Sequence, residues 1–94
     1  MGYQFEWDAA KASSNAKKHR VGFEEASTVF GDPLAVLKSD PDHSVREMRY
    51  LLLGASSTGR LLVVAFAERP PRTRIISARR ATRAERRQYE QEEG

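Results

Sequence analysis

The chain has no cysteine among its 94 residues, which excludes disulfide bonds, thiolate metal sites and cysteine nucleophiles. With only two histidines present, a His-Cys metal site cannot be assembled either. Long hydrophobic runs are also missing, because the two longest, residues 50–55 and 61–67, are far too short to cross a bilayer. Near the N-terminus, Glu6 and Asp8 stand where a signal peptide would be basic and apolar. We therefore expect a cytoplasmic protein that needs no metal or other cofactor and does not associate with membranes.

The length is that of one small domain, and we expect residues 1–94 to form it. Hydrophobic residues make up 39% of the chain and charged residues 31%, which is enough for a thin core and far from the composition of a disordered tail. With no disulfide available, burial of apolar surface must stabilise the fold.

Acidic residues become scarce in the last quarter of the chain. Residues 69–87 hold eight arginines against one acid, Glu85, whereas residues 1–68 carry eight bases and nine acids. A guanidinium group binds phosphate or carboxylate bidentately and stacks on bases, which an ammonium group cannot do. The pattern predicts a polyanion or an acidic protein as partner. The alternative is a solvated basic face that serves only solubility.

Periodicity in the first third of the chain predicts a strand and two helices. Residues 3–7 alternate aromatic and polar side chains, as a strand does, with the aromatic rings on one face. Asp8 is a suitable N-cap for a helix from Ala9 to about His19. A second helix is predicted over residues 23–30, ending at the Gly-Asp-Pro of residues 31–33.

The remaining chain predicts an antiparallel meander followed by a helix. Four strands are expected, at residues 34–38, 49–56, 60–68 and 72–79. A polar loop is expected at residues 39–47, with turns at 57–59 and 70–71. Strict alternation in the last strand predicts one face with Ile75, Ser77 and Arg79, and another with Arg74, Ile76 and Ala78. A last helix is expected from Thr82 because Thr82 and Glu85 have the spacing of a capping box.

This order of elements indicates an α+β fold. The first two helices are expected to cover one face of the sheet. The opposite face, rimmed by the arginines of the last strand and the C-terminal helix, is the expected place for a ligand.

Short motifs spread over nearly the whole chain resemble those of one family. They are Phe5-Glu6-Trp7-Asp8, residues 15–19, Phe23-Glu24-Glu25-Ala26, Phe30, Asp32-Pro33, Arg49-Tyr50-Leu51-Leu52, and residues 59–64, 74–81 and 85–89. Together they resemble BrnT, the toxin of a type II toxin–antitoxin pair. One departure is visible, because the family usually has glycine directly after the lysine-histidine pair, where this chain has Arg20.

The resemblance implies a RelE-like fold and a ribonuclease activity that arrests translation. It also implies neutralisation by a cognate BrnA-type antitoxin. Operator DNA is expected as a partner only through the complex of toxin and antitoxin, which represses its own operon.

Metal-independent RNA cleavage needs a base for the 2′-hydroxyl proton, a cation for the phosphorane charge and an acid for the leaving oxygen. The candidate cations are Arg79, Arg80 and Arg83, where the last strand meets the last helix. Backbone donors at the start of that helix add to a phosphate site. The alternative for any one arginine is an ion pair inside the fold, such as Arg79 with Glu68 or Glu85.

His19 and Glu68 are the candidates for proton transfer. The helix dipole at His19 favours the imidazolium form, which suits an acid or a phosphate ligand, although a simple helix-capping role fits equally well. Glu68 is a candidate base, and a salt bridge with Arg72 or Arg74 explains it equally well. Glu85 is expected to serve the capping box instead.

Five further residues are candidates for RNA binding: Arg49, Arg60, Arg74, Arg87 and Tyr89. Arg87 lies four residues after Arg83 and therefore shares its helix face. Arg49 and Arg60 open strands, where edge charges are also common. Tyr89 can stack on a base or donate a proton, but docking of the helix on the sheet is the more common role of such an aromatic residue.

Three functions fit these features. The first is a metal-independent endoribonuclease toxin, and the second is a non-catalytic nucleic-acid-binding module acting in operon autoregulation. The third is a module that only binds the antitoxin. The chain has no helix-turn-helix or zinc-finger pattern, which disfavours the second function.

Overall fold

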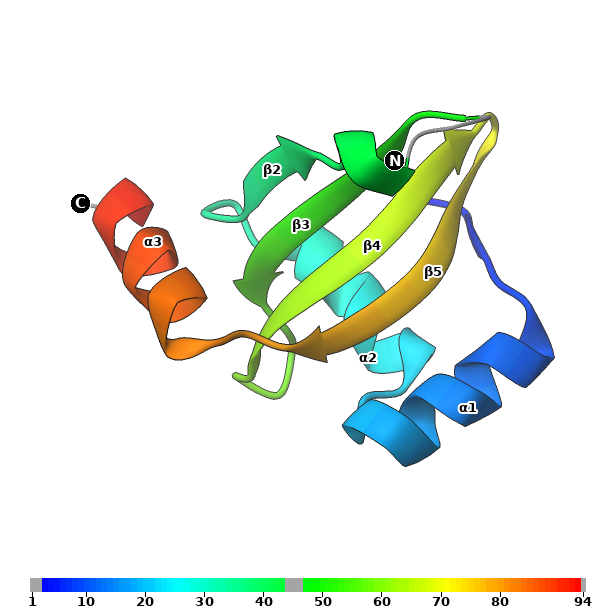
Figure 1. The fold of residues 1–94 in the computed structure, drawn as a ribbon, viewed down its shortest axis with the longest axis horizontal. Helices are drawn as coiled ribbons and strands as arrows, with labels where there is room; N and C mark the ends of the chain where they lie inside the picture. Colours follow the sequence, from blue (N-terminus) through cyan, green and yellow to red (C-terminus); the bar gives the residue numbers. More distant parts are fainter. Residues whose placement is uncertain (1–2, 44–46, 94) are drawn as a thin grey trace.

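A five-stranded sheet and three helices form the molecule, which is seen here in a computed structural model that describes residues 3–43 and 47–93 (Figure 1). In chain order the elements are β1 (Phe5–Glu6), α1 (Ala9–His19), α2 (Phe23–Thr28), the 3₁₀ turn η1 (Val29–Gly31), β2 (Val36–Ser39), the 3₁₀ turn η2 (Pro41–His43), β3 (Arg49–Ala55), β4 (Leu61–Arg69), β5 (Arg72–Arg80) and α3 (Arg83–Glu93). The predicted α+β class and element order are confirmed.

The strands lie in the order β1-β5-β4-β3-β2. The pairs β2–β3, β3–β4 and β4–β5 are antiparallel, which confirms the predicted meander. β1 joins the sheet as a short parallel neighbour of β5, with Phe5 opposite Thr73. Only two residues of the predicted first strand pair in this way. Of the predicted loop at 39–47, residues 44–46 lie outside the described residues.

The local signals for α1 are confirmed. The Asp8 carboxylate accepts a hydrogen bond of 3.0 Å from the backbone amide of Lys11, as an N-cap does. The helix ends at Arg20, whose backbone is left-handed at φ 60° and whose amide donates to the Ala16 carbonyl. The second predicted helix is shorter than expected, because α2 tightens into η1 after Thr28.

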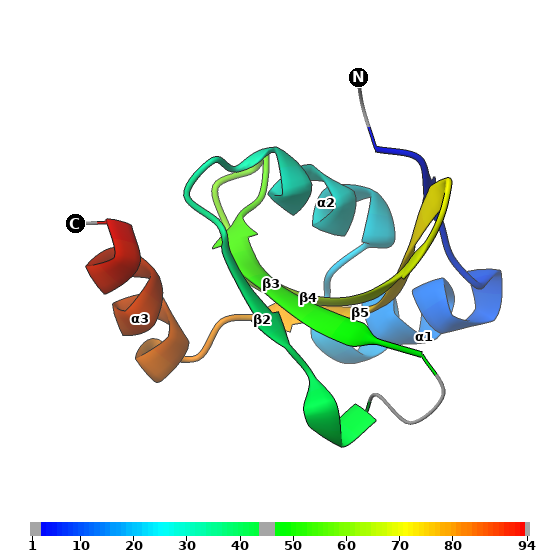
Figure 2. The ribbon, with the colours of Figure 1, turned by 90° about the horizontal axis from the view of Figure 1, so that it is seen from above.

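The core lies between the sheet and the first two helices. Its fully buried side chains come from α2 and the loop before it, such as Val21 and Phe23, and from the central strands, such as Leu62, Val64 and Ile75. A smaller cluster on the opposite face of the sheet receives α3. Figure 2 shows α2 along one face of the curved sheet, with α1 and α3 at its two sides.

The expected faces of β5 are wrong, because a β-bulge shifts the register between Ala65 and Phe66. Ile75 lies opposite Phe66 and Ala78 lies opposite Val64, so both are buried on the face that α1 and α2 cover. Strict alternation had placed Ile75 and Ala78 on opposite faces. The other face then carries four β5 residues, namely Arg72, Arg74, Ser77 and Arg79.

The buried side chain of Asn15 fastens α1 to β5. Its amide nitrogen donates to the carbonyls of Ala78 (2.8 Å) and Val21 (3.0 Å), and its oxygen accepts from the amide of Ala78 (3.1 Å). A buried amide that makes three hydrogen bonds fixes the packing of the two elements it joins. The end of β5 that leads into α3 is thereby held against α1. None of the helices in the described residues is long and apolar enough to cross a membrane.

Candidate functional site

The junction between β5 and α3 contains the capping box predicted from the sequence. The Thr82 amide donates to Glu85 Oε1 (2.8 Å), and the Glu85 amide donates to Thr82 Oγ1 (3.1 Å). Arg79 donates to both oxygens of the same carboxylate, at 2.8 and 2.9 Å. This bidentate hydrogen bonding from Arg79 holds the pKa of Glu85 at about 2, against the opposing effect of burial. Arg79 is therefore engaged by an acid of its own chain, which is the alternative foreseen for it.

Arg80 does not join Arg79, because neighbouring residues of a strand point to opposite faces. Arg79 lies opposite Val63 and Arg80 lies opposite Leu62, and these two β4 residues belong to the clusters on opposite faces of the sheet. Arg79 and Arg80, which are both candidate cations for the phosphorane charge, therefore cannot face the same phosphate. Arg80 is exposed and instead lines a hollow of about 340 Å³ that it shares with Arg60 and Arg86. We call this hollow, defined by these three residues, the arginine hollow.

Arg60 is fixed in place by an acidic residue of α2. Its Nε donates to Glu25 at 2.9 Å, and its Nη2 forms an ion pair with the same carboxylate. The hydroxyls of Ser56 (2.7 Å) and Thr58 (2.6 Å) also donate to Glu25. Hydrogen bonding from Arg60 is the largest influence on Glu25 and, despite burial, holds its pKa at about 2. The guanidinium group of Arg60 thus stands at the wall of the hollow in one orientation.

Four other arginines around the junction make no ion pair within residues 3–43 and 47–93; they are Arg80, Arg83, Arg86 and Arg87. All four are exposed. On α3, the spacing of three and four residues after Arg83 places Arg86 and Arg87 beside it. Like charges that are not neutralised by the chain itself provide a surface for an external anion.

His19 lies at the same end of the molecule as the arginine hollow. It is the last residue of α1, and the carbonyl of the next residue, Arg20, accepts a hydrogen bond of 3.0 Å from Arg60. The imidazole is half-buried. This placement keeps His19 among the candidates for proton transfer.

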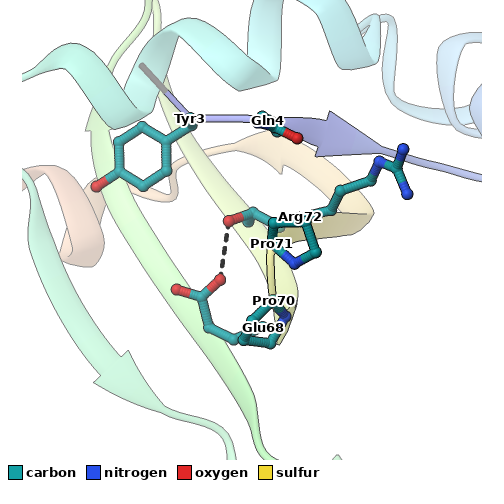
Figure 3. Close-up of a pocket in the computed structure, with 7 residues that line it drawn as sticks. Tyr3, Gln4, Glu68, Pro70, Pro71 and Arg72 are labelled. Atoms are coloured by element: carbon teal, nitrogen blue, oxygen red, sulfur yellow. Dashed lines mark hydrogen bonds between the residues drawn. The ribbon is translucent and has the colours of Figure 1, made fainter. Parts of the chain in front are cut away.

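Glu68 lies at the other end of β4, beyond reach of the arginine hollow. It pairs with Thr73, seven residues along β5 from Arg80, which corresponds to about 23 Å at the rise of a strand. Its Oε1 accepts a hydrogen bond of 2.8 Å from the Thr73 hydroxyl (Figure 3). The salt bridge foreseen with Arg72 or Arg74 is not formed among the described residues. The expectation that Glu68 works beside the arginines is wrong, because the hairpin separates them.

The remaining predicted RNA-binding residues are distributed over the opposite face of the sheet. Arg74 pairs with Glu6 at 3.1 Å, and Arg49 begins β3 as a half-buried residue. Tyr89 packs on the cluster that includes Leu53, and its hydroxyl donates to Asp32 at 2.7 Å. Tyr89 therefore docks α3 on the sheet, the role considered the more common one.

Sequence reasoning did not single out Arg86, Glu25 or Asn15. A signal for Arg86 existed, since it lies one helical turn after Arg83. The roles of Glu25 and Asn15 depend on residues that are distant in the chain, Arg60 and Ala78, and no local pattern announces them. Among residues 3–43 and 47–93, no group of three or more histidine, aspartate and glutamate side chains is arranged to hold a metal ion.

Comparison with known proteins gives two findings. The family described as "Ribonuclease toxin, BrnT, of type II toxin-antitoxin system" matches residues 7–85. The crystal structure of the Brucella abortus ribonuclease toxin BrnT is similar, with a TM-score of 0.63 over 86% of this chain and 99% of that chain. Its sequence is 20% identical, so this likeness concerns the fold. No curated protein matches the sequence significantly.

Proposed function

This chain belongs to the BrnT family of ribonuclease toxins of type II toxin–antitoxin systems, and we propose that it cleaves RNA at the arginine hollow. The observation that carries the proposal is the hollow itself, in which Arg80 and Arg86 lie exposed beside the anchored Arg60. Arg83 and Arg87 continue the unpaired cationic surface along α3. Single-stranded RNA offers a row of phosphates to such a surface.

The chemistry that these groups support is stabilisation of negative charge. When the 2′-hydroxyl attacks the neighbouring phosphate, the phosphorane gains charge that preorganised guanidinium groups offset. Arg60 is already oriented by Glu25, which offsets its charge, so Arg60 adds oriented N–H donors while the uncompensated positive charge comes from Arg80 and Arg86. The exposed Arg80 and Arg86 then close on the phosphate from the other side. This arrangement requires no metal ion, and we propose metal-independent cleavage.

The carboxylates near the hollow position arginines rather than move protons. Glu25 and Glu85 are both hydrogen-bonded to arginine and have a pKa of about 2, so they remain ionised at neutral pH and are poor proton acceptors. His19 is the candidate for proton transfer at this end, because an imidazole can accept a proton and donate it again. We propose that it takes the 2′-hydroxyl proton and delivers it to the 5′-oxygen, which leaves as its bond to phosphorus breaks.

In the cell, cleavage of RNA arrests translation in the cytoplasm, and a BrnA-type antitoxin neutralises the toxin. The complex of the two proteins binds operator DNA. The family supports an antitoxin partner, and the identity of that antitoxin as BrnA-type is part of the proposal.

The decisive experiment measures RNA cleavage by purified protein, free of antitoxin and in the presence of EDTA. We expect the double variant Arg80→Ala/Arg86→Ala to lose about 100-fold or more of its cleavage rate, because two phosphate-binding cations are removed. Arg72→Ala is the matched control, since Arg72 is also exposed but lies at the other end of β5. Cleavage by a well-folded double variant at the rate of the control would rule out the arginine hollow as the site.

The same assay separates the other candidate function, which the unpaired arginines also favour. A non-catalytic module would bind nucleic acid through these arginines with a steep salt dependence and leave RNA intact. Intact RNA after incubation with the wild-type protein would favour that function.

A further inference from the structure

A second hollow, of about 230 Å³, lies on the helix-covered side of the sheet and differs in chemistry from the first. Its apolar lining includes Tyr3, Phe30, Leu37, Leu52 and Phe66. Two acids, Asp32 and Glu68, belong to the same lining. We call the space that these seven residues define the apolar hollow. Glu68 and Tyr3 also border the adjoining hollow drawn in Figure 3.

The apolar hollow exposes large hydrophobic side chains to solvent. Tyr3 is 57% exposed and Leu37 is 59% exposed, although both are large apolar groups. The wall behind them is firmly packed, because Phe30 makes edge-on ring contacts with Tyr3 (5.2 Å) and Phe66 (4.9 Å). Exposed apolar groups gathered at a preformed hollow are typical of a protein–protein contact.

The charge of the apolar hollow indicates which partner it suits. Its lining contains Asp32 and Glu68 but no lysine or arginine, in a chain whose formal net charge is +3. The Asp32 carboxylate is already occupied by the amides of Leu34 and Ala55 and the hydroxyl of Tyr89. Glu68 accepts one hydrogen bond through Oε1, which leaves Oε2 for a cation. RNA is disfavoured here by its own negative charge, whereas a basic and apolar peptide segment is complementary.

The backbone beside the hollow also suits a peptide. Leu37 belongs to β2, which is an outer strand of the sheet. The Asp40 amide bonds to the Arg49 carbonyl, and bonding pairs alternate along an antiparallel ladder, so the backbone groups of Leu37 point away from β3. An added segment can pair with such groups while its side chains enter the hollow.

We propose that the apolar hollow is the docking site of the antitoxin. The antitoxin places an apolar side chain against Leu37 and Tyr3 and a lysine or arginine beside Glu68. This inference rests on the proposed function, because it takes the partner to be the antitoxin of a toxin–antitoxin pair. The apolar hollow and the arginine hollow share no lining residue, so the anchor of the antitoxin is separate from the arginine hollow.

The test measures antitoxin affinity and RNA cleavage on the same variants. The probe is a purified BrnA-type antitoxin, titrated into the wild-type protein and its variants by calorimetry. We expect Leu37→Ser to weaken binding by more than about tenfold, because it removes a central apolar anchor. Tyr3→Ser is a second, independent variant of the same surface. Lys38→Ala is the matched control, since Lys38 is also exposed but its side chain bonds to Gln88 on the other side of β2.

Glu68→Gln tests the charge of the docking site. We expect weaker binding and a shallower salt dependence of the affinity, because one ion pair with the antitoxin is lost. RNA cleavage by free Leu37→Ser protein should match that of the wild type. Its thermal unfolding is measured alongside, so that lost binding is not confused with lost folding.

Three results would overturn the docking proposal. The first is antitoxin binding by Leu37→Ser and Tyr3→Ser at wild-type affinity. The second is lost RNA cleavage in a well-folded Leu37→Ser protein, which would make the hollow part of the RNA site. The third is a wild-type dimer, seen by sedimentation, that Leu37→Ser dissociates. Failure of the wild type to cleave RNA would contradict the proposed ribonuclease activity alone, because antitoxin binding is measured without RNA.

Discussion

The arginine hollow and the apolar hollow are both built around β4 and its neighbours, yet they are stabilised by opposite means. At the first, the ion pair of Arg60 with Glu25 orients a charge beside solvent. At the second, the ring contacts of Phe30 with its aromatic neighbours hold an apolar wall beside two acids. The difference shows that the fold places uncompensated arginines at one hollow and acids at the other, a separation that the net charge does not reveal.

The ion pairs explain how that sorting arises. Among the eight arginines of residues 69–87, three are neutralised by acids of the same chain, namely Arg69 by Glu47, Arg74 by Glu6 and Arg79 by Glu85. Arg80, Arg83, Arg86 and Arg87 make no ion pair among the described residues, so the uncompensated charge gathers where β5 leads into α3. A cluster of basic residues in a sequence overstates the cationic surface until its internal partners are known.

The largest effect is expected at the apolar hollow. Phe30→Ala removes a ring that packs edge-on against three others, and we expect a loss of about 3 kcal/mol in the free energy of unfolding. The loss should be the same at neutral and mildly acidic pH, because the lost contacts join uncharged rings. Urea denaturation at both pH values measures it. A loss that depends on pH would show that the rings are energetically coupled to the acids of the same hollow, Asp32 and Glu68.

A smaller effect, and one that depends on pH, is expected at the arginine hollow. Glu25→Gln should cost about 1.5 kcal/mol near pH 7, because the charge-assisted hydrogen bonds to Arg60 are weakened. The folded-state pKa of Glu25, about 2, lies below its ordinary value of 4.5. Its stabilising contribution is therefore complete above pH 4.5 and is lost as the pH falls toward 2.

The measurement is the difference in unfolding free energy between wild type and Glu25→Gln across that pH range. The difference should shrink steadily as the carboxylate of the wild type becomes protonated. A difference that stays constant down to pH 2 would contradict the assigned ion pair.

The smallest effect is a gain in stability at Arg20. Its backbone has φ 60°, a conformation that favours glycine and costs an arginine about 1 kcal/mol. Arg20→Gly should therefore stabilise the fold by about 0.5 to 1 kcal/mol, since the greater freedom of glycine in the unfolded chain offsets part of the gain. The carbonyl that accepts from Arg60 is kept.

Arg20→Ala provides the comparison for this effect, because it removes the same side chain and leaves the backbone strained. Thermal unfolding of both variants separates the two contributions. Equal stability of Arg20→Gly and Arg20→Ala would mean that the left-handed turn carries no strain.

Features that depend on neighbouring residues could be predicted from the sequence. Asp8 as the N-cap of α1 and the capping box of Thr82 with Glu85 are each formed within four residues, and both are present as expected. The meander was predictable because turn residues separate its strands. The bulge at Ile76 was not, since it is a property of two paired strands and leaves no signature in either one.

The candidate site was only partly predictable. Arg80 and Arg83 could be found from the density of arginines, but the engagement of Arg79 by Glu85 depended on which of several acids lay near it. The distance between Glu68 and Arg80 could have been predicted from the sequence. In a hairpin that turns at residues 70–71, Glu68 must lie near the turn, and Arg80 must lie at the far end.

The amide of Asn15 has a consequence for which side of the sheet can accept another strand. By both donating to and accepting from Ala78, it imitates the peptide group of a neighbouring strand. Together with β1 opposite Thr73, it caps part of the β5 side of the sheet, so an incoming strand of a partner is directed to β2.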